Sequence, residues 1–470
     1  MRTLICFLSA LACCSVARAG EAEILANIRT FFNTRDAKAR EQLARSIEQD
    51  DAYDRARVSE WLHRAGLFEK LSPGRITIRA ALADGTARQI LIRVPPGYDP
   101  THAYPLIYCL HGQGGHADGI LRYFEALLGD RADKFVLAAP DQYDEAVIHH
   151  SKWPPTGEHL VSLERIRETI NTDADRTFVA GYSRGGHTSW TLGVLHADQW
   201  AGVMPLSGTF LMAEIDRLWE YMLGNVTNTH ILAVWGENDV FDDRHNKSAD
   251  GGIAGLDRRL RKLAQSIGTP LTAIELPGIG HGGVRPPKDE LDKLLSRTRV
   301  RTPANVRTAF RHPYQAGAYW LEGALWTGKV WGAVPPMVEL PPTGTFRNDD
   351  VHDQLAKLLR SRLGEIKGHI DGQTLSVRRR HLRELYVWIS DGMIDWDQPV
   401  KLEVNGRKVF EGAVHPDLFV CLSQAQRTRD FERLRWAGFK FHSGKKLRMI
   451  TGDMQFPPTG VSPDEFRKSR

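Results

Sequence analysis

A serine at position 183 lies in a context that suits a nucleophile. The segment GYSRG (181–185) fits the pattern G-x-S-x-G, and it stands between the apolar run TFVA and a stretch with helix-like spacing. Such a placement puts Ser183 in a sharp turn between a strand and a helix, where small neighbours are needed and the hydroxyl is raised clear of the sheet. The pattern therefore predicts a nucleophilic serine rather than a plain structural turn.

Two later segments could activate this serine. A serine hydroxyl needs a base to take its proton, and that base needs a third group to orient it. Asp239 follows the strand-like run HILAVWG, and His281 lies in the glycine-rich segment PGIGHGG after another such run. We expect Asp239 to be the acid and His281 the base. Three nearby carboxylates are alternative acids: Glu237, Asp242 and Asp243.

Two main-chain N–H groups are predicted to hold the oxyanion of an acyl-transfer reaction. The run PLIYCL leads into HGQGG (111–115), a loop that could turn the N–H of Gln113 toward the serine. Arg184 begins the following helix, so its N–H is the second predicted donor. We expect His111 to brace the loop rather than to act as a base. No phosphate-binding glycine spacing occurs here, which disfavours a nucleotide-binding loop.

Contacts to the substrate are less sharply indicated. Trp153, in HHSKWPPTGE, should lie at the rim of the cleft, where it could stack on an aromatic or sugar ring or pack locally. Tyr182, directly before the serine, is the second predicted substrate contact. The side chain of Arg184 could meet an acidic group of the substrate or simply be exposed. No Cys/His spacing indicates a metal site, and no cofactor is expected.

Alternating strand-like and helix-like segments must position these residues. A hairpin with an Asp84-Gly85 turn comes first. Continuous apolar strands separated by amphipathic helices then predict an α/β fold, a mostly parallel sheet with helices on both faces. The strands are expected at 105–110, 134–140, 177–181, 202–208, 230–236 and 272–278, and the helices near 118–129, 158–170, 185–197, 211–223, 253–267 and 287–297.

Residues 76–297 resemble the α/β-hydrolases. The resemblance rests on YPLIYCLHGQGG, RTFVAGYSRGGHTSWTLGVLHADQWAGVMPLSG, VWGENDV and PGIGHGG. It is strongest to the secreted bacterial esterase and predicted-peptidase branch, near the feruloyl esterases, polyhydroxybutyrate-depolymerase-like esterases and prolyl oligopeptidase catalytic domains. The resemblance implies the nucleophile, acid, base and oxyanion donors named above. Arg184 departs from the Met or Leu of the esterases and from the Tyr of the oligopeptidases, which weakens the peptidase interpretation.

The flanking ranges predict further parts. Residues 20–72 are helical in character, 73–300 form the catalytic domain, and 301–350 are expected to be a linker or extension. Strand periodicity after that predicts an all-β, sandwich-like accessory domain at 351–447, with an edge helix at 351–363 and DLFVCLS (417–423) among its strands. Residues 448–470 are expected to form a loosely held tail.

The first 19 residues have the features of a secretory signal peptide. An Arg precedes an apolar run, and ARA stands before Gly20, so we expect export to the periplasm or the extracellular space after cleavage near Ala19. A lipoprotein anchored at Cys13 is the less favoured alternative. No other segment is long and apolar enough to cross a membrane. Cys109 and Cys421 would remain, and we expect two buried free thiols rather than a disulfide.

Charge and composition restrict the function classes. The net charge is +5, and residues 301–470 hold 27 Lys/Arg against 19 Asp/Glu, a mild bias that does not predict nucleic-acid binding. Six of the 12 tryptophans lie in this part, which is compatible with carbohydrate contact through the accessory domain or with core packing. We expect a secreted serine hydrolase that cleaves carboxylic esters through an acyl-enzyme, including polysaccharide-linked or aromatic esters. A prolyl-oligopeptidase-like peptidase and a non-catalytic carbohydrate-binding protein are the alternatives.

Overall fold

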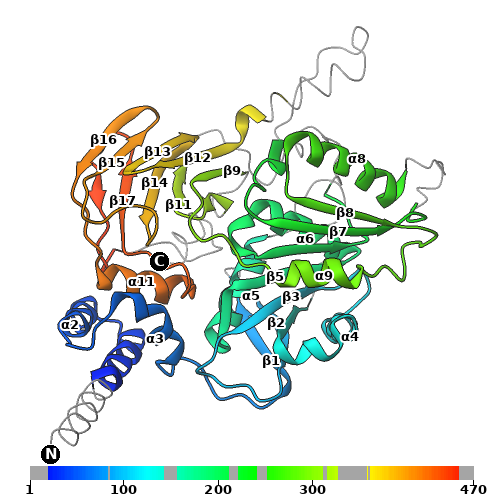
Figure 1. Ribbon diagram of the computed structural model, residues 1–470, viewed down its shortest axis with the longest axis horizontal. Coiled ribbons are helices and arrows are strands. Elements are labelled where there is room, and N and C mark those ends of the chain that lie inside the picture. The colour runs from blue at the N-terminus through cyan, green and yellow to red at the C-terminus, as the bar shows by residue number, and fades with distance from the viewer. Residues whose placement is uncertain are drawn as a thin grey trace, which may run out of the picture.

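An eight-stranded mixed sheet forms the centre of the larger part of the molecule (Figure 1). Its strand order is β1-β2-β4-β3-β5-β6-β7-β8; β1 and β2 form an antiparallel hairpin, β2 pairs antiparallel with β4, and all other neighbours are parallel. The mostly parallel sheet predicted from the sequence is therefore confirmed. The strands are β1 (Gly74–Ala81), β2 (Ala87–Val94), β3 (Tyr104–Leu110), β4 (Val136–Pro140), β5 (Thr172–Tyr182), β6 (Gly202–Leu206), β7 (His230–Gly236) and β8 (Leu271–Leu276).

The computed structural model describes most of the chain. The described residues are 20–82, 85–141, 156–210, 221–240, 251–310, 315–326, 357 and 360–454.

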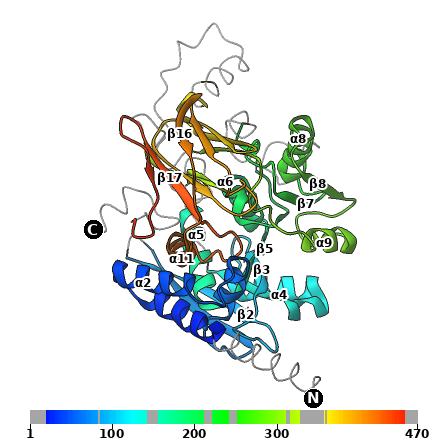
Figure 2. The same cartoon turned by 60° about the vertical axis from the view of Figure 1, so that its left-hand side comes forward.

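Helices cover both faces of this sheet (Figures 1 and 2). Successive strand residues point to opposite faces, so Tyr108 packs in one apolar cluster and its neighbours Ile107 and Cys109 in the other. The first cluster includes side chains of α5 (Thr156–Thr169), α6 (Arg184–Leu195) and α8 (Gly252–Ile267). The second includes side chains of α4 (Ala117–Leu128) and α9 (Lys288–Leu295). Two apolar layers thus fix the sheet from either side.

A smaller β-sandwich follows the large sheet in the chain. Its two five-stranded sheets have the orders β16-β15-β13-β12-β9 and β10-β11-β14-β17-β18, and a single apolar cluster packs between them. The predicted sandwich-like domain is therefore confirmed. Its strands are β9 (Asn305–Phe310), β10 (Gly317–Ala318), β11 (Leu321–Trp326), β12 (Gly364–Asp371), β13 (Thr374–Arg380), β14 (Leu382–Ile389), β15 (Val400–Val404), β16 (Arg407–Gly412), β17 (Ala437–His442) and β18 (Arg448–Met449).

The sandwich begins earlier in the chain than the sequence pattern indicates. The range 301–350 was expected to be a linker, whereas β9, β10 and β11 give part of it to the two sheets. These strands are short, and they can be recognised as strands only because β9 pairs with β12 and β11 pairs with β14. The small strand β18 likewise lies at the start of the expected tail. The helix predicted at 351–363 falls mostly outside the described residues.

One predicted strand is a helix. DLFVCLS was expected to be a strand, but these residues begin α11 (Leu418–Thr428), whose N-cap Asp417 accepts a hydrogen bond from the N–H of Val420 (3.1 Å). Almost every side chain in the first two turns is buried, so the apolar residues form a continuous run without a helical period. Such a run fits a buried strand and a buried helix equally well, and this explains the wrong prediction.

The N-terminal helices pack against α11 (Figure 1). A helix over residues 20–33, α2 (Ala37–Glu48) and α3 (Val58–Arg64) share one apolar cluster with α11. Arg45 of α2 also donates to the carboxylate of Asp417 (2.9 Å). The N-terminal helices and α11 thereby form one helical layer beside the sandwich.

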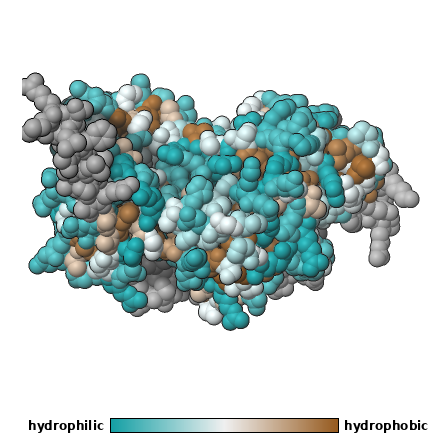
Figure 3. All heavy atoms as spheres, turned by 60° about the horizontal axis from the view of Figure 1, so that its bottom comes forward, coloured by the Kyte–Doolittle hydropathy of each residue, from teal (hydrophilic) through white to brown (hydrophobic). Residues whose placement is uncertain are grey.

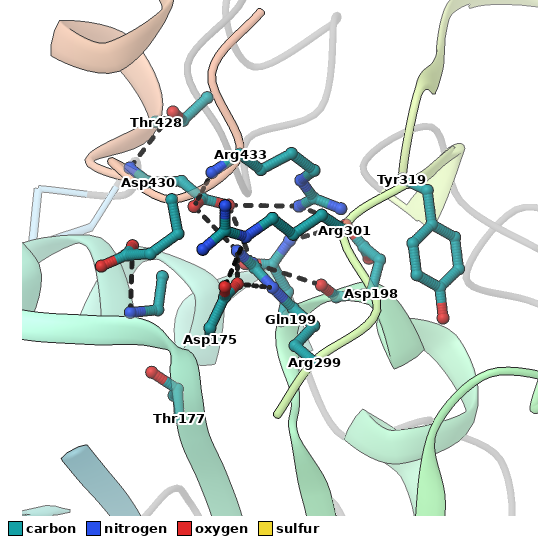
Figure 4. Close-up of polar contacts among 12 residues, drawn as sticks. Asp175, Thr177, Asp198, Gln199, Arg299, Arg301, Tyr319, Thr428, Asp430 and Arg433 are labelled. Atoms are coloured by element: carbon teal, nitrogen blue, oxygen red, sulfur yellow. Dashed lines mark hydrogen bonds and ion pairs between the residues drawn. The ribbon is translucent and has the colours of Figure 1, made fainter. Parts of the chain in front are cut away.

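A buried network of ions joins the large sheet to the C-terminal part (Figure 4). The guanidinium of Arg299, whose side chain is 0% exposed, lies between Asp175 of β5 (3.0 Å) and Asp430, which follows α11 (2.8 Å). Arg433 donates to Asp198 (3.0 Å) and to Asp430 (3.3 Å). Burial alone would raise the pKa of Asp430, but the charges of Arg299 and Arg433 outweigh it and hold this pKa well below its usual range.

Hydrophilic residues predominate on the face of the molecule shown in Figure 3. Within the described residues, no helix combines the length and the apolar character that a membrane span requires.

Both described cysteines are buried free thiols, as the sequence favoured: Cys109 on β3 and Cys421 on α11. Burial raises the pKa of each thiol well above its usual value. The large apolar side chains exposed in the described part are scattered: Val240, Ile267, Val300 and Met449.

Replacing Asp430 by Asn should strongly destabilise the protein, because Arg299 and Arg433 would keep buried charges without their carboxylate. Breaking one partner of a buried ion pair costs about 3–5 kcal/mol of the free energy of unfolding, measurable by urea denaturation. The matched control is Asp133→Asn, which removes the carboxylate paired with Arg93 on the surface and should cost no more than about 1 kcal/mol. If the two variants lost the same free energy of unfolding, the buried network would stabilise the protein no more than the surface pair does.

Candidate active site

Ser183 occupies the sharp turn between β5 and α6, as the sequence predicts. Its backbone has φ 56° and ψ −116°, a positive-φ conformation that a non-glycine residue adopts only under strain. The N–H of Ser183 donates to the main-chain oxygen of Leu206 at the end of β6 (2.8 Å), which holds the turn in place. A Cβ on Gly185 would overlap the main-chain oxygen of Leu110, so the glycine lets α6 start directly over the end of β3.

The structure brings His281 and Asp239 to this serine. The Nε2 of His281 lies 2.8 Å from the Oγ of Ser183, and its Nδ1 lies 2.9 and 3.0 Å from the two carboxylate oxygens of Asp239. Asp239 is 1% exposed. An ionised carboxylate only accepts hydrogen bonds, so Nδ1 must carry the proton and Nε2 presents its lone pair to the hydroxyl. This arrangement can remove the proton of Ser183.

Main-chain contacts join the turn of Asp239 to the loop of His281. The N–H of Asn238 donates to the oxygen of Ile279 (2.8 Å). The loop crosses directly over Gly236, at which a Cβ would overlap the main-chain oxygens of Ile279 and Gly280. Glycine at this strand end is therefore required for the acid and the base to meet.

Glu237, the described one of the three alternative acids, does not take the place of Asp239. The Oε2 of Glu237 accepts a hydrogen bond from the N–H of Gly278 (2.8 Å), so this carboxylate supports the turn before the base. Asp242 and Asp243 lie outside the described residues.

The segments that carry the two predicted oxyanion donors, Gln113 and Arg184, lie next to Ser183 in the structure. A Cβ on Gly112 would lie 3.3 Å from the Cβ of Ser183, so the start of the loop that carries Gln113 lies against this residue. The Nδ1 of His111 donates to the oxygen of Gly112 (2.8 Å), as expected of a brace. Arg184 is the first residue of α6, and the N–H groups of a helix's first turn point out of its positive end.

The two predicted substrate contacts have different outcomes. The hydroxyl of Tyr182 donates to the main-chain oxygen of His281, so the structure gives it a protein partner. Trp153 lies outside the described residues.

Sequence reasoning missed three residues close to the site. Ser207, with φ 45°, donates from Oγ to the main-chain oxygen of His281 (3.1 Å); the only hint in the sequence is its place at the end of PLSG. His187 accepts a hydrogen bond from the N–H of Thr209 (2.8 Å), and burial lowers its pKa to about 4. Burial raises the pKa of Asp257 well above its usual value. Burial therefore favours the uncharged forms of His187 and Asp257, both of which are near enough to Asp239 to sense its charge.

Metal ligands do not cluster in the described part of the chain. No group of three or more His, Cys, Asp or Glu side chains there could hold a metal ion. The contacts of Ser183, His281 and Asp239 allow proton transfer between the hydroxyl and the imidazole.

Comparisons with known proteins find feruloyl esterases among the relatives of this chain. No family model matches the chain. It is 27% identical to a probable feruloyl esterase C of Aspergillus niger over 131 residues, and 29% identical to feruloyl esterase C of Emericella nidulans over 133 residues. Each match covers 26% of this chain and 46% of the relative, so the chain spans about half the length of these curated relatives. A probable feruloyl esterase C of Aspergillus terreus is 24% identical over 225 residues, which are 44% of this chain and 81% of that protein.

Likeness to solved structures is slight. A thermostable esterase has a TM-score of 0.38 at 17% identity, covering 48% of this chain and 63% of that one. A ferulic acid esterase from Anaeromyces mucronatus has a TM-score of 0.34 at 17% identity, covering 45% of this chain and 86% of that one.

Replacing Asp239 by Asn should slow the reaction of Ser183 with a fluorophosphonate probe about 10⁴-fold, because the amide would favour the wrong tautomer of His281. The measurement is the labelling rate of the folded protein. The matched control is Glu237→Gln, whose amide oxygen can still accept the N–H of Gly278, and we expect it to label at nearly the wild-type rate. A slower Glu237 variant beside an unaffected Asp239 variant would reverse the assignment of the acid.

Proposed function

We propose that this chain, which has the α/β-hydrolase fold, is a serine hydrolase that cleaves carboxylic esters through an acyl-enzyme. The observation that supports the proposal is the contact of Ser183 Oγ with His281 Nε2, with Asp239 on the other side of the imidazole. Three residues from separate strand ends meet there in the order that a nucleophile, a base and an orienting acid require. The resemblance to feruloyl esterases agrees with ester hydrolysis.

The mechanism has two halves. His281 takes the proton of Ser183 as the oxygen attacks the ester carbonyl, and the N–H groups of Gln113 and Arg184 stabilise the oxyanion. The protonated His281 then gives its proton to the leaving alcohol, which leaves an acyl group on the serine. A water molecule, deprotonated by the same imidazole, releases the acid and restores the hydroxyl. Asp239 stays ionised throughout and stabilises the imidazolium.

The proposed substrates are aromatic or polysaccharide-linked esters. The support is the similarity to proteins named feruloyl esterases, and it concerns about half the length of those relatives. The accessory sandwich could add contact with a carbohydrate. A peptidase uses the same three side chains on an amide bond, so an assay has to distinguish the two bonds.

Ester and amide substrates should separate the two activities. We expect turnover of p-nitrophenyl and feruloyl esters, and slower turnover of aminoacyl p-nitroanilides. Ser183→Ala should lower ester turnover by at least about a thousandfold, because it removes the nucleophile and leaves only the oxyanion donors and binding. Its unfolding midpoint serves as the control for folding. Faster cleavage of the anilides by the wild type would replace the esterase proposal by a peptidase.

We also propose that residues 1–19 are a cleaved export signal. Production of the full chain in a secreting bacterial host should give an exported protein whose N-terminal sequence begins at Gly20. Mass spectrometry of the exported protein measures this directly. Replacing Ala17 and Ala19 in the ARA segment by bulky residues should block cleavage. The signal peptidase of the host requires small side chains at these two positions. A lipid-modified N-terminus at Cys13 would instead support the lipoprotein alternative.

A further inference from the structure

The loop that carries His281 has few side chains with which to hold itself in place. Four of the residues 278–283 are glycines: Gly278, Gly280, Gly282 and Gly283. A Cβ added to Gly278, Gly282 or Gly283 would meet no heavy atom within 4 Å. Glycine also gives the backbone more conformational freedom than any other residue. The position of the imidazole must therefore be fixed by other contacts.

Two hydroxyl groups converge on one main-chain oxygen of this loop. The oxygen of His281 accepts a hydrogen bond from the hydroxyl of Tyr182 and another from the Oγ of Ser207 (3.1 Å). A carbonyl oxygen has two lone pairs, so these donors can occupy both. They come from the ends of the neighbouring strands β5 and β6, where Tyr182 pairs with Leu206, the residue before Ser207.

Both donors are themselves fixed by the sheet. Ser207 is fully buried, and its N–H donates to the oxygen of Val234 on β7 (2.9 Å). The ring of Tyr182 lies between the rings of Tyr123 and His281, with centroids 5.8 Å away in each case. The hydroxyl of Tyr123 donates to the oxygen of Val284 (2.6 Å), which fastens the far end of the same loop.

We propose that Tyr182 and Ser207 are positioning residues that clamp the main-chain oxygen of His281 and so hold its imidazole against Ser183. The inference rests on the proposed function for its kinetic consequences, but the clamp itself is a property of the loop. Tyr182 is the neighbour of the nucleophile, so the clamp ties the base to the turn that it serves. Burial raises the pKa of Tyr182, which keeps the phenol protonated as a donor.

Removing the two hydroxyls should slow chemistry without weakening substrate binding. Tyr182→Phe and Ser207→Ala each keep the packing, and alanine keeps the same backbone strain at Ser207. We expect kcat to fall about tenfold in each variant and about a hundredfold in the double variant, since a misplacement of about 1 Å can cost that much. KM should stay unchanged, and fluorophosphonate labelling should slow in parallel with kcat.

A second readout does not depend on activity. Hydrogen–deuterium exchange of residues 278–284, followed by mass spectrometry, should become faster in the double variant than in the wild type. The control is Tyr98→Phe, which removes a buried hydroxyl that accepts the N–H of Asn171 (3.0 Å) far from the loop. It should lower the unfolding midpoint, yet leave kcat and exchange of the loop unchanged.

The outcomes separate the clamp from the proposed function. Unchanged exchange of the loop in the double variant overturns the clamp, whatever the activity. A rise in KM at unchanged kcat, with fluorophosphonate labelling unaffected, also overturns the clamp and makes Tyr182 a substrate contact. A wild-type protein that reacts with no ester and no fluorophosphonate refutes the serine hydrolase, while faster exchange in the double variant would still support the clamp.

Discussion

The close approach of three strand ends is the constraint on which the site depends. At Gly185 the start of α6 lies against the main-chain oxygen of Leu110, and the N–H of Ser183 binds the oxygen of Leu206. The nucleophile is thus placed by main-chain contacts with β3 and β6, which leave little freedom for adjustment. The strained backbone at Ser183 can persist because the contacts with β3 and with β6 hold it from both sides.

Strand β5 joins the candidate site at one of its ends to the buried ion network at the other. β5 carries Ser183 beyond its carboxyl end, while Asp175, near its start, belongs to the buried ion network with Arg299 and Asp430 (Figure 4). The described residues of this junction therefore lie at the opposite end of β5 from the candidate site. They hold the C-terminal part against the sheet without touching the residues proposed for chemistry.

Asp239 is the charged group that acts on His281, and two other buried groups close to this pair favour their neutral forms. His187 and Asp257, which lie near the acid and the base, favour their neutral forms because they are buried. The charge of Asp239 can then act mainly on His281, which it contacts through Nδ1. Neutral hydroxyl groups, rather than further charges, hold the loop of the base, so positioning does not compete with that interaction.

The sequence alone determined the parts that local chemistry encodes. The apolar runs and their spacing predicted all eight strands of the large sheet, and the G-x-S-x-G turn with Asp239 and His281 predicted the residues that meet there, because each follows directly from its own strand. Tertiary structure decided what depends on partners far along the chain. The run 417–423 begins α11, and its apolar pattern does not distinguish a buried helix from a buried strand. Strands β9 to β11 can be recognised only from their pairing, and the hydroxyl of Tyr182 meets His281 because β5 and β6 end side by side. A residue type records what a group can do, whereas its partner is fixed only when distant segments pack together.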